Sequence, residues 1–179
     1  MNLFDMNNDN TIMNIDGKDI EFKPAVCYGW THDKWFVSRC GKLWSLSIKK
    51  ELKPSIKYSY SKWAVGGRKI SRSNLTISTP PNFWPDGSGR PHSTKNHWVR
   101  DITVHKIVMD TWKPLYDNPP LGVSGEFWKI GRDYPDNLRW YSESVAIDHI
   151  DDNPLNNDID NLRRVSQWDN NPFRKKNGI

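Results

Sequence analysis

The residues whose types and spacing could do chemistry gather in one stretch, residues 145–171. Asp148 and His149 are adjacent there, and Asn161 and Asn170 follow His149 by twelve and twenty-one positions. A carboxylate, an imidazole and a distant amide oxygen are the groups that a phosphodiesterase with one metal ion requires. The pattern therefore predicts a catalytic centre here, and the rest of the chain is interpreted as a platform that brings DNA to it.

Short elements must position these side chains. Residues 145–147 are apolar and predict a strand that ends at the Asp148–His149 pair. Consecutive strand residues point to opposite faces, so both side chains reach one site only through a local twist or bulge. Turn-forming residues fill positions 151–160, residues 162–165 indicate a second strand, and Ser166 is a suitable N-cap for a short helix. Strand, loop, strand and helix together make a ββα unit.

Alternating apolar and polar residues predict a twisted antiparallel β-sheet in the first half of the chain. Turns are expected at Asp16–Gly17, Cys40–Gly41 and Gly66–Gly67, each of which separates two strand-like runs. Residues 79–97 are rich in Pro, Gly and Ser and predict an irregular loop. The fold class expected is α+β, an N-terminal twisted antiparallel sheet followed by the C-terminal ββα unit.

One helix is expected at residues 102–113, because apolar residues recur there with helical spacing and Pro114 follows. His105 lies beside the apolar stripe of that helix. It is interpreted as a packed or surface residue, because no acidic residue adjoins it. Residues 116–144 are expected to form a long, loop-like insertion.

The charge of the chain is unevenly distributed. The net charge is +5. Residues 39–113 carry fifteen Lys and Arg against four acidic residues, a net charge of +11, and residues 161–179 carry +4. Residues 114–160, which include Asp148, carry −7. The basic blocks suit a polyphosphate backbone, while the clustered carboxylates favour a neutralising cation.

Several motifs at family spacing resemble the HNH endonucleases, also called ββα-metal nucleases. They are VHKIV at 104–108, DHIDDN at 148–153, NNDIDNLRRV at 156–165 and Asn170. The likeness is closest to the homing-type enzymes of phages and introns, whose upstream sheet element the segment WFVSRCGKLWSLSIKKELKPS also resembles. The resemblance implies a basic β-rich DNA-binding region at 1–100 and a nuclease domain at 101–179, lengthened by the insertion at 116–144.

The resemblance also implies roles for individual residues. His149 would be the general base, and Asn161 would hold the loop so that His149 faces the phosphate. Asp148 and Asn170 would bind one divalent metal, Mg²⁺ or Mn²⁺, with Asn171 as an alternative ligand. Double-stranded DNA is the expected partner. The candidates for contacts with its backbone are Arg163, Arg164, Arg174, Lys175, Lys176, Lys49, Lys50, Lys53, Arg68 and Lys69.

Other features limit the class of protein. No apolar stretch is long enough for a membrane helix, and the N-terminus is acidic and Asn-rich, unlike a signal peptide. We therefore expect a cytoplasmic protein without membrane contact, in the host cell if a phage encodes it. Cys27 and Cys40 form no CxxC pair, which indicates two free, buried thiols and not a zinc site.

Two other functions remain open from the sequence. The first is a DNA-binding phage packaging or regulatory protein with a vestigial HNH unit, and the second is an RNA-cleaving enzyme. One site per chain cuts one strand per binding event, so double-strand cleavage needs a homodimer or rebinding.

Overall fold

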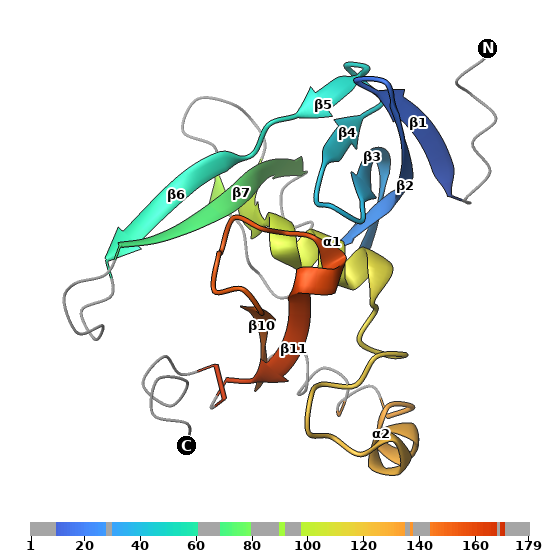
Figure 1. The fold of residues 1–179 in the computed structure, drawn as a ribbon, viewed down its shortest axis with the longest axis vertical. Helices are drawn as coiled ribbons and strands as arrows, with labels where there is room; N and C mark the ends of the chain where they lie inside the picture. The colour runs from blue at the N-terminus through green and yellow to red at the C-terminus, as the bar shows by residue number, and fades with distance from the viewer. Residues whose placement is uncertain are drawn as a thin grey trace.

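The computed structural model describes most of the chain. The described residues are 10–27, 30–60, 69–79, 90–91, 98–134, 137, 144–167 and 169–170. They form antiparallel strands, two α-helices and one short 3-10 helix (Figure 1). The coarse α+β class is therefore as expected.

The first sheet is an antiparallel meander of five strands in chain order. The strands are β1 (Thr11–Ile15), β2 (Lys18–Cys27), β3 (Trp30–Ser38), β4 (Leu43–Ser45) and β5 (Lys50–Leu52). Asp16 and Gly17 turn between β1 and β2 with φ of +53° and +78°, and Gly41 turns between β3 and β4 with φ of +81°. Both predicted turns are confirmed.

The second sheet has four strands in the order β6-β7-β9-β8. They are β6 (Ser55–Tyr60), β7 (Lys69–Thr79), β8 (Arg90–Pro91) and β9 (Trp98–Thr103). The prediction of one sheet was wrong, because the strands β1 to β9 divide between two sheets. Pro54, which cannot donate a backbone hydrogen bond, lies between β5 and β6. In Figure 1, β6 and β7 form a long ribbon that projects away from the five-stranded sheet.

The loop expected at 79–97 also needs correction at its edges. Thr79 belongs to β7, and Arg90–Pro91 pairs with Trp98 and Val99 of β9. Pro91 therefore sits in a two-residue edge strand, where its missing N–H is tolerated. Positions 80–89 and 92–97, and the turn predicted at Gly66–Gly67, lie outside the described residues.

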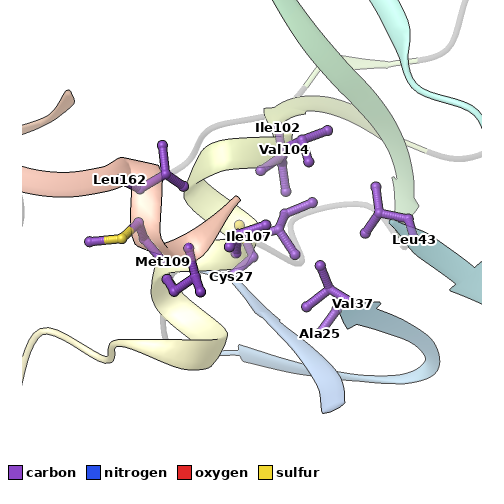
Figure 2. Packing of buried hydrophobic residues seen from close by; sticks show 11 residues of the cluster. Ala25, Cys27, Val37, Leu43, Ile102, Val104, Ile107, Met109 and Leu162 are labelled. Carbon is purple, nitrogen blue, oxygen red and sulfur yellow. The ribbon is translucent and has the colours of Figure 1, made fainter. Parts of the chain in front are cut away.

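Helix α1 (Val104–Trp112) confirms the predicted helix, although it begins two residues later because β9 continues to Thr103. Val104, Ile107, Val108 and Met109 are buried along it. They pack against residues of β2, β3 and β4 and against Leu162 (Figure 2). Ile159 belongs to the same cluster, and the partly buried Ile147 packs against it. One core therefore joins residues from both sides of position 100.

The insertion at 116–144 is not wholly loop-like, because it contains helix α2 (Gly125–Gly131). The Ser124 side chain caps its start by accepting from the Phe127 N–H, and Glu126 lies in the first turn. Trp128 is buried and donates its indole N–H to the Tyr116 carbonyl at 2.8 Å. A serine cap followed by an acidic residue was the sequence signal for this helix.

The C-terminal hairpin pairs β10 (Val145–His149) with β11 (Leu162–Ser166) in antiparallel register, and a 3-10 turn η1 (Ile159–Asn161) precedes β11. After β11, Ser166 accepts from the Asp169 N–H through its hydroxyl and from the Asn170 N–H through its carbonyl, both at 3.0 Å. These bonds have the pattern of the predicted capped turn. The rest of the predicted helix lies outside the described residues.

Among the glycines in the described residues, Gly41 is the one at which substitution is expected to cost most. A Cβ at Gly41 would meet the Asn157 Cβ at 2.9 Å and the Asn157 carbonyl oxygen at 3.2 Å, and its φ is +81°. We predict that Gly41→Ala lowers the free energy of unfolding in urea by more than the roughly 1–2 kcal/mol of the positive φ alone. Gly17→Ala is the matched control, since Gly17 has φ +78° and nothing within 4 Å. Equal losses in the two variants would contradict this packing.

Candidate active site

Asp148 is a buried carboxylate on β10, 4% exposed. It pairs across the hairpin with Arg163 of β11. The Arg163 guanidinium donates to one oxygen of Asp148 through Nε at 3.0 Å, and its Nη2 forms an ion pair with the same oxygen at 2.9 Å. The pair thereby compensates a charge that would otherwise be buried alone. The Arg163 side chain is 44% exposed, so its guanidinium also lies within reach of solvent.

His149 follows Asp148 in the same strand and is 8% exposed. Its Nε2 lies 3.5 Å from the Asn157 side-chain oxygen. The His105 ring of α1 stands nearly perpendicular to it, with ring centroids 5.2 Å apart and an interplanar angle of 71°. A local twist or a bulge was expected at this pair; the pairing of β10 with β11 shows no register shift, so no bulge is present and the twist stays a prediction.

Asn161 ties together the loop between the two strands. Its amide nitrogen donates to the Asp151 carboxylate and to the Asn156 carbonyl, both at 2.9 Å. Its amide oxygen accepts from the Asp151 N–H at 3.1 Å, and its carbonyl accepts from the Ile150 N–H at 2.9 Å. Four bonds from one residue fix the chain immediately after His149. The bonds tie the loop together, as the resemblance implies for Asn161; that they make His149 face a phosphate stays a prediction.

Asp151 is the acceptor at the centre of that loop. Hydrogen bonds from the Asn156 side chain, the Asn153 backbone and the Asn161 side chain hold its pKa below the ordinary value of 3.8. Each bond stabilises the ionised carboxylate, which accepts but does not donate. The ordered loop therefore depends on Asp151 being charged.

Asn170 is half-buried in the turn that follows β11. Its backbone bonds to Ser166, which pairs with Val145 at the end of the hairpin opposite Asp148. The chain must fold back along the hairpin for the Asn170 amide to reach Asp148, as the predicted helix would do. Asn170 and its alternative, Asn171, stay predicted ligands, and Asn171 lies outside the described residues.

Arg164 is a correction to the predicted DNA contacts. It is 6% exposed, donates to the Lys113 carbonyl, and pairs with Asp110 of α1 at 3.2 Å. Burial lowers its pKa, and the adjacent Asp110 partly restores it. Neighbouring strand residues point to opposite faces, so Arg164 points inward while Arg163 points to Asp148. Arg164 joins the hairpin to α1 and is not available to a phosphate.

The remaining predicted DNA contacts divide into two groups. Lys49, Lys50 and Lys53 are exposed around β5, where the chain turns with Lys49 at φ +50°. Lys69 lies at the start of β7, but its side chain is outside the described residues. Arg68, Arg174, Lys175 and Lys176 also lie outside them.

Two residues beside His149 were not assigned to the site from the sequence. His105 was expected to be packed or exposed without a role, yet its ring contacts that of His149. Asn157 was counted only as a turn former, yet it faces the His149 imidazole. The motifs VHKIV and NNDIDNL contain these residues, but nothing in one sequence shows that they meet in space.

The donor chemistry at Asp148 and Asn170 fits a hard divalent cation, because both offer oxygen ligands. The buried Asp148 carboxylate already has a cationic partner in Arg163, as a buried carboxylate requires. Among the described residues, no three His, Cys, Asp or Glu side chains gather as a metal cluster. The predicted metal ligands, Asp148 and Asn170, are one carboxylate and one amide, so they do not form a cluster of that kind.

The two cysteines are free, as predicted. Cys27 is buried in the core, and its burial raises the pKa of the thiol to about 12. Cys40 is exposed at the turn before Gly41, so the expectation that both are buried was wrong for Cys40. In the part of the chain that is described, neither helix is long and apolar enough to cross a membrane.

Comparisons with known proteins agree with the motifs. Residues 139–171 match the family model described as HNH endonuclease, a span that contains Asp148, His149, Asn161 and Asn170. The chain is also similar to a solved structure described as "DNA binding and cleavage by the HNH homing endonuclease I-HmuI", with 19% identity and a TM-score of 0.43. That similarity covers 89% of this chain and 60% of the other, so this chain spans less than two thirds of its length. No curated protein matches the chain.

The lowered pKa of Asp151 predicts a dependence of stability on pH. A carboxylate whose pKa is lower in the folded state than in the unfolded state stabilises the fold at pH values above its ordinary pKa of 3.8. This stabilisation is lost as the pH falls through the folded-state pKa. We expect the free energy of unfolding of the unmodified chain to fall more steeply than that of Asp151→Asn between about pH 5 and pH 2. Urea titrations across that range measure it. Parallel curves would show that Asp151 does not couple folding to protons.

Proposed function

With residues 139–171 matched to the HNH endonuclease family, we propose that this chain is a metal-dependent DNA endonuclease that hydrolyses phosphodiester bonds. One observation carries the proposal. The matched span places adjacent Asp148 and His149, both buried, at the end of a hairpin whose following loop is fixed by Asn161. The Asp148 carboxylate, the His149 imidazole and the loop held by Asn161 thus lie within one short segment of the chain.

His149 acts as the general base. Its neutral imidazole takes a proton from water, and the water oxygen attacks the phosphorus. The bond from phosphorus to the 3′ oxygen then breaks, which leaves a 5′-phosphate and, after protonation, a 3′-hydroxyl. An unperturbed imidazole has a pKa of about 6.5, which suits proton abstraction near neutral pH.

Asp148 and Asn170 would hold one divalent cation through oxygen atoms, Mg²⁺ or Mn²⁺ being the expected ions. The bound ion would neutralise charge on the scissile phosphate and on the departing oxygen. Arg163, paired with Asp148 at 2.9 Å and 44% exposed, balances the carboxylate. Its exposed guanidinium would be available to a phosphate oxygen. Asn161 keeps the loop closed around this arrangement.

Double-stranded DNA is the proposed substrate, bound through its backbone by cations outside the hairpin. Lys49, Lys50 and Lys53 are the described candidates, because they are exposed on one short segment. Arg68, Lys69, Arg174 and Lys175 remain candidates from their sequence positions. The motif pattern favours a homing-type enzyme of phage or mobile-element origin, and double-strand cleavage would require a homodimer or rebinding.

Cleavage of supercoiled plasmid tests the proposal. We predict nicked or linear product with Mg²⁺ or Mn²⁺ and none with EDTA. His149→Ala is expected to lower the rate by about 10²–10⁴-fold, because the general base is lost. Asp148→Asn is expected to abolish metal-dependent cleavage. His32→Ala is the matched histidine control, because His32 stacks on Trp35 in the five-stranded sheet. This variant should cleave plasmid at the rate of the unmodified chain.

Three outcomes would contradict the proposal. Equal cleavage by the unmodified chain and His149→Ala would locate the activity elsewhere or in a contaminant. Salt-dependent DNA binding without cleavage under either metal, unchanged in Asp148→Asn, would favour the binding protein with a vestigial HNH unit. Cleavage of RNA but not DNA would replace the substrate class.

A further inference from the structure

We propose that Asn157 is a positioning residue for His149, which it holds in the tautomer with the proton on Nε2, and that Asn157 connects His149 to strand β7 through Ser73. The catalytic consequence rests on the proposed function, whereas the tautomer and the connection do not. Asn157 is 8% exposed and lies where the site loop meets both sheets.

The orientation of the Asn157 amide follows from its two other partners. Its Nδ2 lies 3.1 Å from the Leu155 carbonyl and 2.8 Å from the Ser73 hydroxyl. A backbone carbonyl can only accept, so the group that faces Leu155 must be the amide NH₂. The amide oxygen therefore faces Nε2 of His149, at 3.5 Å. The Leu155 carbonyl, which has no proton to donate, thus fixes which end of the Asn157 amide faces His149.

The tautomer of His149 follows from that orientation. An amide oxygen accepts and cannot donate, so the atom facing it must carry the proton. In the neutral imidazole, a proton on Nε2 leaves the lone pair on Nδ1. Asn157 thus selects Nδ1 as the atom that takes the proton from water.

Contacts from three directions hold Asn157 itself. Gly41 packs so closely that a Cβ there would meet the Asn157 Cβ at 2.9 Å. Ser73 of β7 accepts from its amide. The chain two residues later is bonded to the same turn, because the Ile159 N–H donates to the Arg39 carbonyl at 2.8 Å. The five-stranded sheet, the four-stranded sheet and the site loop therefore share this position.

His105 completes the restraint on the imidazole. Its ring is nearly perpendicular to His149 with centroids 5.2 Å apart, so it limits tilting of the His149 plane. Asn157 fixes which nitrogen carries the proton.

Nitrogen-15 NMR of the full chain, without metal or DNA, tests the tautomer. At alkaline pH, where the ring is neutral, we expect a protonated Nε2 and an unprotonated Nδ1 for His149, with a slowly exchanging Hε2 signal. Asn157→Leu should lose that signal. Asn157→Asp retains an acceptor and should keep it, although the chain becomes less stable. Asn153→Ala, in the same loop, is the matched control and should leave the signal unchanged.

Three results would overturn the proposal. They are a proton on Nδ1 in the unmodified chain, an unchanged Hε2 signal in folded Asn157→Leu, and loss of the signal in Asn153→Ala. If Asn157→Leu does not fold, Ser73→Ala decides. That variant removes the connection to β7 but leaves the acceptor, so the Hε2 signal should persist with faster exchange. Exchange at the unmodified rate would show that Ser73 does not restrain Asn157.

Cleavage kinetics add the catalytic readout. Asn157→Leu should lower kcat by roughly tenfold or more, because part of the general-base contribution depends on orientation, while KM for plasmid stays unchanged. Asn157→Asp should recover most of kcat. A change in KM alone would assign Asn157 to DNA binding. If the unmodified chain does not cleave, the proposed function fails, while the NMR result still decides the tautomer.

Discussion

The site depends on the packing of one short helix. The apolar residues of α1 pack against Cys27, Val37 and Leu43 of the five-stranded sheet and against Leu162 of the C-terminal hairpin (Figure 2). Ile159 of η1 belongs to the same cluster. These residues are far apart in the sequence, and hydrophobic contact with α1 is what brings them together. At about 25 cal/mol per Å² of apolar surface removed from water, this shared core is the main attraction between the hairpin and the sheet. The same core holds α1 so that the His105 ring contacts the His149 ring.

Two arginine–carboxylate pairs formed by β11 also stabilise the hairpin. Arg163 and Arg164 are neighbours on β11 and face opposite ways, so each meets a different carboxylate. Arg164 fastens the hairpin to Asp110 of α1, and Arg163 balances Asp148 at the site. Removing either partner of a buried pair leaves an uncompensated charge, which costs more than the pair contributes. Arg164 thereby anchors the hairpin to α1, while Asp148 and Arg163 pair on the other face of the hairpin.

The sequence predicted elements that depend on local signals and missed those that depend on tertiary contacts. The pairs Asp16–Gly17 and Cys40–Gly41 located two hairpin turns, and Pro114 located the end of α1. The division into two sheets was not predicted. Whether the strands on either side of Pro54 belong to one sheet or to two is decided by tertiary packing, which a local sequence pattern does not show. The positions of His105 and Asn157 escaped prediction for the same reason. Arg164 was misassigned because an arginine near a catalytic motif looks the same in sequence whether it faces DNA or Asp110.

The central claim is that His149 directs water to the phosphorus of a DNA strand. Cleavage in H₂¹⁸O, followed by mass spectrometry of the new ends, tests it most directly. The account predicts one ¹⁸O atom on a 5′-phosphate opposite an unlabelled 3′-hydroxyl, and no such product from His149→Ala. Labelled 3′-phosphate ends, or the same labelled product from His149→Ala, would contradict it.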